Sequence, residues 1–147
     1  METPITGTCQ CGDVRYAVHH EPLVTAACHC QDCQKLSASA FSITMIIPEA
    51  AFELLSGELS VFERPADHGG KAICYFCPTC SNRVYHKNPI MPGFLRLKPG
   101  GLDDTSKIQP QVHVWTSRAQ PWYQIPEGVP SYETQPDLQE FLAALQG

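Results

Sequence analysis

The pattern of hydrophobic and polar positions predicts a chain built mostly from short strands. Val14, Tyr16 and Val18 alternate with polar or small residues, which is typical of a half-buried strand. Further runs rich in β-branched and aromatic residues are separated by turn-forming residues such as 56–58 and 66–70. These runs are residues 23–27, 41–47, 52–55, 59–64, 71–76, 83–86, 94–97 and 112–115. We therefore expect a mainly β fold.

Helical periodicity is confined to the end of the chain. Over residues 137–146 the apolar side chains recur with the spacing of one helix face, at Leu138, Phe141, Leu142 and Leu145. Pro136 suits the first turn of such a helix and Gly147 its end. Residues 34–40 are expected to form a short helical turn, and the proline-rich residues 117–136 to lie extended on the surface.

Length and composition narrow the class of protein. With 147 residues and 43% hydrophobic content, the chain is expected to fold as one domain over residues 1–147. Its net charge of -5 argues against a nucleic-acid surface, and it has no apolar run long enough to span a membrane. No secretory signal is visible, so we expect a cytoplasmic, reducing location. In that compartment eight clustered cysteines indicate metal ligands rather than disulfides.

Three of these cysteines, Cys28, Cys30 and Cys33, lie within six residues of sequence. A disulfide cannot use three thiols, whereas zinc prefers four ligands in a tetrahedron and accepts thiolates. Three protein ligands would leave the fourth position open, as in catalytic zinc sites. His29 alternates with two of these cysteines, so its side chain is expected to point away from the metal.

The other cysteines fit a closed site. Cys9 and Cys11 form one pair and Cys77 and Cys80 another, and together they would give four thiolates around a structural zinc. Cys74 has the same spacing to Cys77, so spacing alone leaves the ligand pair open. Cys77 with Cys80 is preferred because Pro78 suits the intervening turn, and Cys74 is then expected to be a buried core thiol. The alternatives are Cys74 as the fourth ligand of the Cys28 group, and two closed sites.

Three motifs resemble those of the glutathione-dependent formaldehyde-activating enzyme family, also called the centromere protein V domain family. They are GTCQCG at residues 7–12, CHCQDCQK at residues 28–35 and FCPTC at residues 76–80. The likeness extends over about residues 6–132, and it departs from the family at Ser81, where glycine is usual. The resemblance implies a β-tent fold, so we expect short antiparallel strands stapled by zinc, followed by the one C-terminal helix that the periodicity predicts.

The resemblance also implies two zinc ions per chain. One is structural, on Cys9, Cys11, Cys77 and Cys80; the other is catalytic, on Cys28, Cys30 and Cys33, with its fourth position open to water or substrate. The implied activity is that of a carbon–sulfur lyase, joining formaldehyde to glutathione to give S-hydroxymethylglutathione. The implied partners are a small thiol and a small aldehyde, with no nucleic acid or membrane.

A zinc ion with three thiolates favours activation of a bound thiol over polarisation of an aldehyde, because the ligands outweigh the charge of the ion. Glutathione carries two carboxylates, and Lys35, two residues after Cys33, is the cation expected to bind one of them. Two alternative functions stay open. One is a zinc-stapled binding module that uses residues 122–132 as its partner surface, and the other is a redox-sensing zinc–thiolate protein.

Overall fold

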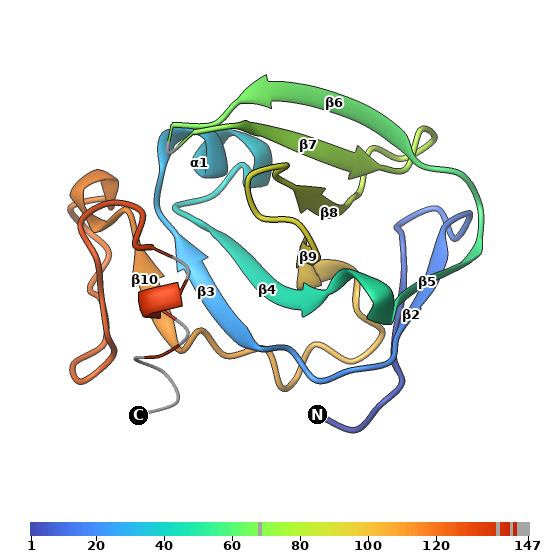
Figure 1. Ribbon diagram of the computed structural model, residues 1–147, viewed down its shortest axis with the longest axis horizontal. Coiled ribbons are helices and arrows are strands. Elements are labelled where there is room, and N and C mark those ends of the chain that lie inside the picture. Colours follow the sequence, from blue (N-terminus) through green and yellow to red (C-terminus); the bar gives the residue numbers. More distant parts are fainter. Residues whose placement is uncertain (68, 138, 142, 144–147) are drawn as a thin grey trace. The chain divides into compact units, whose positions relative to one another are not determined.

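The computed structural model describes residues 1–67, 69–137, 139–141 and 143 (Figure 1). The chain divides into two compact units, the first comprising Met1–Pro22 and Met45–Ile108 and the second Leu23–Thr44 and Gln109–Gly147. Over the described residues strands far outnumber helices, so the expected mainly β fold is confirmed. That residues 1–147 act as a single domain stays a prediction.

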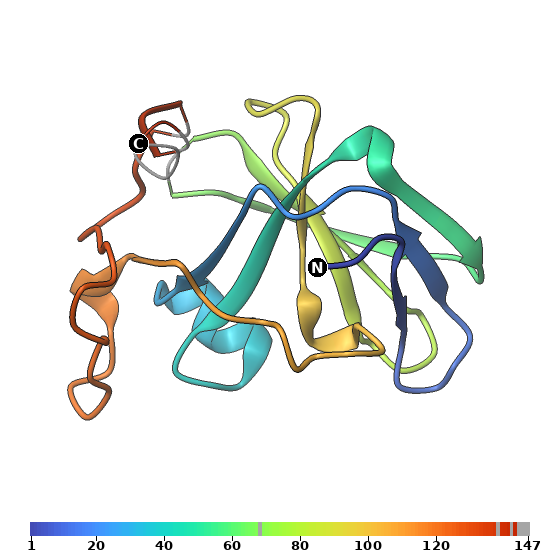
Figure 2. The same cartoon turned by 90° about the horizontal axis from the view of Figure 1, so that it is seen from below.

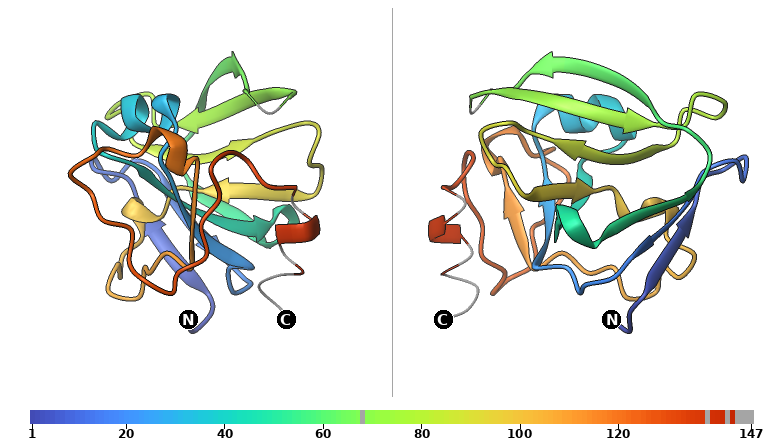
Figure 3. Two further views of the ribbon diagram at one scale, coloured as in Figure 1. Left: turned by 90° about the vertical axis from the view of Figure 1, so that its left-hand side faces the viewer. Right: turned by 45° about the vertical axis from the view of Figure 1, so that its right-hand side comes forward.

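The first unit contains two groups of antiparallel strands. The smaller group has the order β1-β2-β5 (Figure 2). In it, Val18 of β2 lies opposite both Ile5 and Phe52. Its strands are β1 (Ile5–Thr8), β2 (Arg15–Val18) and β5 (Phe52–Ser56). The larger group has the order β4-β9-β8-β7-β6, and its green strands β6 and β7 run side by side in Figure 3. Its strands are β4 (Ser42–Pro48), of which residues 45–48 belong to this unit, β6 (Ser60–Pro65), β7 (Lys71–Phe76), β8 (Arg83–Lys87) and β9 (Phe94–Leu97).

Alternation along these strands builds the core of the first unit. Met45 and Ile47 of β4 lie opposite Leu97 and Leu95 of β9, and all four side chains are buried. They pack with the alternating residues of β2 and with its neighbour Val14, which confirms that part of the sequence pattern. Cys9 and Cys77 belong to the same buried cluster. Two short 3-10 helices, Glu49–Ala51 and Pro99–Gly101, complete this unit.

The second unit is built around a parallel pair of strands. Strand β3 (Val24–Cys28) pairs with β10 (Val112–Val114), so that Cys28 lies opposite Val114 (Figure 1). This pair differs from the antiparallel pairing expected for the chain. Every residue of β3 before Cys28 is buried, as is usual for a parallel strand that is covered on both faces.

Helix α1 (Gln31–Ser37) follows β3 and begins three residues before the expected turn at 34–40. The earlier start has a local cause. The side chain of Cys30 accepts a hydrogen bond from the backbone N–H of Cys33 and so caps the helix. The helix ends where Ala38 takes a left-handed conformation with φ of 51°. The prediction of the boundary was therefore wrong, because the capping role of a cysteine gives no usual sequence signal.

The end of the chain is described in part. Residues 139–141 and 143 are helical, and the Asp137 carboxylate accepts hydrogen bonds from the N–H groups of Gln139 and Glu140. The helix predicted over 137–146 therefore begins as expected. Its predicted apolar positions Leu138, Leu142 and Leu145 lie outside the described residues. A third short 3-10 helix, Thr116–Arg118, follows β10.

The part of the chain that the structure describes contains no helix both long and apolar enough to cross a bilayer.

The close approach of β1 and β2 predicts the effect of a small substitution. Gly7 lies opposite Tyr16, and a Cβ atom at Gly7 would overlap the buried ring of Tyr16. We expect Gly7→Ala to lower the free energy of unfolding by about 1–3 kcal/mol, because the core must shift to admit the methyl group. Urea denaturation of the zinc-loaded protein measures this change.

Gly100→Ala is the matched control, since no atom lies within 4 Å of a Cβ placed there. We expect this control to stay within about 0.5 kcal/mol of the wild type. Equal stability of Gly7→Ala and Gly100→Ala would contradict the packing described for β1 and β2.

Candidate metal centres

Among the described residues, seven cysteine side chains gather into two groups whose sulfur atoms lie within 4.8 Å of one another. The four-cysteine cluster belongs to the first unit and consists of Cys9, Cys11, Cys77 and Cys80. The three-cysteine cluster belongs to the second unit and consists of Cys28, Cys30 and Cys33. The structure thus brings together the two sets of cysteines that the sequence motifs indicated. That these cysteines bind a metal stays a prediction.

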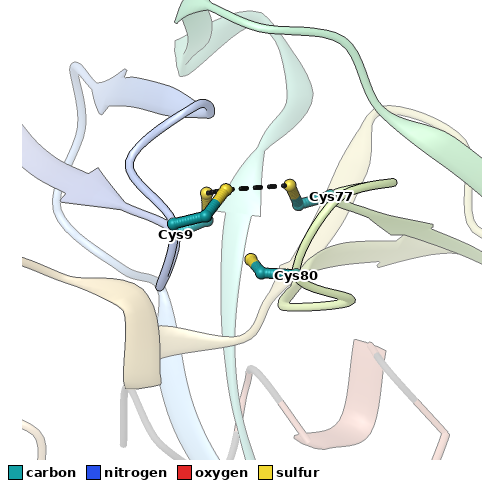
Figure 4. Close-up of side chains that lie close together, drawn as sticks. Cys9, Cys77 and Cys80 are labelled. Atoms are coloured by element: carbon teal, nitrogen blue, oxygen red, sulfur yellow. Dashed lines mark hydrogen bonds between the residues drawn. The ribbon is translucent and has the colours of Figure 1, made fainter.

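Two tight loops form the four-cysteine cluster. After β1, the N–H of Gly12 donates to the carbonyl of Cys9 and so curls the chain around the two cysteines of this loop. After β7, the N–H of Ser81 donates to the carbonyl of Cys77 over 2.8 Å, and Ser81 takes a left-handed φ of 66°. Figure 4 shows Cys9 facing Cys77 and Cys80 across the gap between the loops.

The distances between the sulfur atoms fit a tetrahedral zinc ion. The Sγ atom of Cys11 lies 3.5 Å from that of Cys9 and 3.7 Å from that of Cys77. Four ligands at the usual zinc–sulfur distance of about 2.3 Å stand about 3.8 Å from one another. A disulfide would need sulfur atoms about 2.05 Å apart, and all eight cysteines are free. The donor set and spacing therefore suit a closed four-thiolate zinc site.

The thiols of this cluster influence one another strongly. Burial opposes ionisation of Cys9, but the N–H of Val14 and the neighbouring thiols lower its pKa to about 6. The N–H of Asp13 favours ionisation of Cys11, yet burial and the three neighbouring sulfur atoms raise its pKa to about 12. One thiolate thus forms easily at the expense of another. A bound divalent cation would offset the repulsion between the negative charges and let all four sulfur atoms ionise.

The three-cysteine cluster sits where β3 passes into helix α1. Cys28 ends the strand, Cys30 caps the helix and Cys33 lies in its first turn. The pKa of Cys28 is raised, first by its hydrogen bonds with the two neighbouring thiols and then by burial. Among the described residues of this unit, no histidine, carboxylate or further cysteine joins the group. The cluster therefore offers a metal three protein ligands from its own unit.

His29 turns away from the neighbouring sulfur atoms, as expected, but into the interior rather than to solvent. It is fully buried, and its Nε2 atom lies 2.8 Å from Nδ1 of His113 on the adjacent strand β10. Burial lowers the pKa of both imidazoles, so one neutral ring donates a hydrogen bond to the other. Phe41 and Tyr123 pack around His29 at ring-centroid distances of 5.1 and 5.5 Å. This packing holds the loop between Cys28 and Cys30 in place.

Lys35 lies on the exposed side of helix α1, beside an open hollow of about 860 Å³. The hollow is lined by Gln31, Gln34, Lys35, Ala38, Ser39, Ala40, Gln120 and Trp122. The amide of Gln120 donates to the side-chain oxygen of Gln34, 86 residues away in sequence, and Trp122 is 71% exposed. The sequence pointed to Lys35 but gave no signal for the glutamines, because their proximity depends on the path of residues 117–136.

Cys74 belongs to neither cluster. Its side chain is completely buried in β7, as expected of a core thiol, and that it binds no metal stays a prediction. Its neighbours are cations: the pKa of Cys74 is raised by burial, while the charges of Arg83, Arg64 and Lys98 act in the opposite direction. Two further histidines, His86 of β8 and His113 of β10, are both buried.

Comparisons with known proteins agree with the motifs and the fold. A family model described as "Glutathione-dependent formaldehyde-activating enzyme" matches residues 4–118. A crystal structure of a Rhodobacter sphaeroides protein superposes with a TM-score of 0.56, covering 70% of this chain and 92% of that chain. At 21% sequence identity this likeness supports the fold alone. No curated protein matches the sequence significantly.

The assignment of Cys74 and Cys77 to different roles is directly testable. We expect Cys77→Ser to lower the zinc content from about two ions per chain to about one, because a closed site needs all four thiolates. Cys74→Ala, three residues earlier in the same segment, should keep both ions. Mass spectrometry of the metal, on protein purified without chelator or metal-affinity tag, measures the difference. If Cys74→Ala loses a zinc ion and Cys77→Ser keeps both, then Cys74 is the ligand and Cys77 is not.

Proposed function

The chain belongs to the glutathione-dependent formaldehyde-activating enzyme family, and on that basis we propose that it is a zinc-dependent carbon–sulfur lyase. It would join glutathione, or another small thiol, to formaldehyde or a similar aldehyde. The observation that carries this proposal is the three-cysteine cluster, whose sulfur atoms meet within 4.8 Å with no fourth donor among the described residues of its unit. The active centre is therefore assigned to Cys28, Cys30 and Cys33.

We assign one zinc ion to each cluster. Cys9, Cys11, Cys77 and Cys80 would hold a closed, structural ion that links the two loops of the first unit. Cys28, Cys30 and Cys33 would hold the second ion. Bound there, zinc would supply a position at which a thiol loses its proton and becomes the nucleophilic thiolate, a role that three negative ligands favour over polarisation of an aldehyde.

The residues around the three-cysteine cluster keep its shape. The N–H of Cys33 donates to the sulfur atom of Cys30 over 3.3 Å, which fixes that sulfur at the start of α1. The N–H of His29 donates to the carbonyl of Val114, and its imidazole is held by His113. A histidine that could otherwise compete as a ligand is thus kept away from the sulfur atoms.

The proposed reaction is an addition and needs no oxidant or reductant. The sulfur of the thiol forms a bond to the carbonyl carbon, and the π electrons of the C=O bond move to its oxygen. The proton released by the thiol ends on that oxygen, which gives an S-hydroxymethyl product. The chain has to bring the two reactants together and to favour the thiolate form.

The hollow beside α1 is the proposed place for one end of the thiol. Glutathione carries two carboxylates and one ammonium group, and Lys35 offers a positive charge at the edge of this hollow. The amide groups of Gln31, Gln34 and Gln120 add donors and acceptors. A carboxylate held by Lys35 would orient the peptide along the surface of α1.

A binding module is the second candidate, and the exposure of Trp122 favours it. A tryptophan that is 71% exposed beside a polar hollow is the kind of residue that anchors partner proteins. This candidate predicts no chemistry at the three-cysteine cluster, so measurements of activity separate it from the lyase.

Removal of one central thiol should abolish activity but leave the structural zinc in place. We expect Cys28→Ser to lose about one zinc ion and to react glutathione with formaldehyde no faster than the uncatalysed mixture. NMR exchange measurements with ¹³C-formaldehyde give the rate, and circular dichroism checks the fold. Cys74→Ala is the control and should keep full activity. Full activity in Cys28→Ser would show that the three-cysteine cluster takes no part in the reaction.

Loss of the Lys35 charge should affect glutathione binding more than turnover. We expect Lys35→Ala to raise KM for glutathione about two- to fivefold, since an exposed charge pair contributes up to about 1 kcal/mol. Lys107→Ala, a cation of the first unit, is the control and should leave KM unchanged. With 2-mercaptoethanol as the thiol, both variants should match the wild type, because this thiol has no carboxylate. An unchanged KM for glutathione in Lys35→Ala would exclude the role.

A further inference from the structure

Gln34 of helix α1 has a half-buried side chain whose amide group bonds three other residues. Its Nε2 atom donates to the carbonyl of His29 over 2.8 Å and to the carbonyl of Arg118 over 3.0 Å. Its Oε1 atom accepts a hydrogen bond from Nε2 of Gln120 over 2.9 Å. Because carbonyl oxygens can only accept, the orientation of this amide is unambiguous. Both of its N–H groups are therefore used within the protein.

Two hydrogen bonds connect Gln34 to the loop of the three-cysteine cluster. The carbonyl of His29 belongs to the peptide bond between His29 and Cys30, so the side chain of Gln34 reaches the loop itself. The backbone N–H of Gln34 also donates to the carbonyl of Cys30 over 3.0 Å. The imidazole of His29 is bonded to His113 in the interior. The loop is thus held by an imidazole from one strand and by a glutamine from helix α1.

The same glutamine holds the wall of the hollow. Its partner Gln120 lines the hollow, as does Trp122 two residues later, and Arg118 precedes both in the same segment. The backbone carbonyl of Gln34 accepts a hydrogen bond from the N–H of Ser39, a further lining residue. The partners Arg118 and Gln120 lie 84 and 86 residues from Gln34 in sequence. One side chain therefore connects this distant wall to the loop that carries the cysteines.

We propose that Gln34 is the positioning residue that couples the hollow to the three-cysteine cluster. A single amide bonds both the wall and the loop, so a molecule held in the hollow lies at a set distance from the sulfur atoms. This inference rests on the proposed function, in which the hollow holds one end of a thiol while its sulfur reaches the cluster. Gln34 acts through its neighbours and does not contact the reacting atoms.

Alignment, rather than stability, is what this amide controls. A single hydrogen bond contributes little to folding, and the carbonyls of His29 and Arg118 can bond to water once the half-buried amide is gone. A shift of about 1 Å between two reacting groups, by contrast, lowers a rate by about a hundredfold. Loss of the amide is therefore expected to leave a folded protein whose wall and loop no longer move together.

Steady-state kinetics of Gln34→Met tests this role. Methionine is similar in length, but it cannot donate to the two carbonyls. With glutathione and formaldehyde we expect kcat to fall about tenfold or more, while KM stays within about twofold because Lys35 is still present. With 2-mercaptoethanol, which is too small to reach from the hollow to the cluster, kcat should match the wild type. An equal fall in kcat with both thiols, or loss of a zinc ion, means that Gln34 only maintains the cluster and overturns the proposal.

Two further variants keep the test sharp. Gln109→Met changes an exposed glutamine of the same unit and should match the wild type with both thiols. Gln120→Met removes one of the three side-chain hydrogen bonds and should lower kcat for glutathione about two- to fivefold. It is the second test if Gln34→Met fails to fold, which circular dichroism will show. Wild-type kcat for glutathione in both Gln34→Met and Gln120→Met overturns the proposal.

Hydrogen exchange of the zinc-loaded chain, followed by mass spectrometry, tests the coupling without any reaction. We expect Gln34→Met to speed exchange in two segments, residues 28–33 and 118–123, and Gln120→Met to speed it in the second segment alone. Faster exchange in only one segment of Gln34→Met overturns the proposal. Faster exchange in both, in a protein whose wild type has no thiol–aldehyde activity, supports the coupling and contradicts the proposed function. An active wild type with unchanged exchange in Gln34→Met does the reverse.

Discussion

Sulfur atoms that stand 3.5 Å apart cannot all carry a negative charge unless a cation lies between them. This constraint applies to the four-cysteine cluster, in which Cys9 and Cys77 are buried in the hydrophobic core with apolar residues of β2, β4 and β9. The pKa of Cys9 is lowered and that of Cys11 is raised, in part because the neighbouring thiols act on each of them. A zinc ion would neutralise the repulsion between the thiolates and would bind together two loops that are far apart in sequence.

The three-cysteine cluster meets the same constraint in a different setting. Its cysteines come from one short stretch, and the cap at Cys30 and the buried pair of His29 and His113 set its shape. The first cluster can complete a tetrahedron from its own loops, whereas the second offers three sulfur atoms from its unit. This difference in ligand number separates a structural role from a chemical one, and the proposed function depends on it.

Features that depend on local spacing could be predicted from the sequence. The alternation of residues 41–47 and 94–97 gave the paired strands of the core, and the turn preference of Pro78 favoured Cys77 over Cys74. The family likeness is confirmed by the match over residues 4–118. Ser81 stands where the family usually has glycine, and its φ of 66° is the left-handed conformation that glycine adopts most easily.

Features that depend on distant pairing could not be predicted. The contact of His29 with His113 follows from the parallel pairing of β3 with β10, and no pattern in either segment indicates it. The pairing of Arg83 with Phe76 follows from a bulge between β7 and β8, which displaces the alternation on which sequence patterns rest. The start of α1 at Gln31 follows from a cysteine acting as the helix cap.

Cadmium-113 NMR of the cadmium-substituted chain tests the central claim most directly, because cadmium accepts the same thiolate ligands and its chemical shift reports the number of sulfur atoms bound. We predict two signals. One, from the four-cysteine cluster, should stay unchanged on addition of glutathione, and the other should move as a fourth sulfur enters the three-cysteine cluster. S-methylglutathione should move neither signal in this way. If glutathione changes the chemical shift of neither signal, thiol activation at Cys28, Cys30 and Cys33 is contradicted.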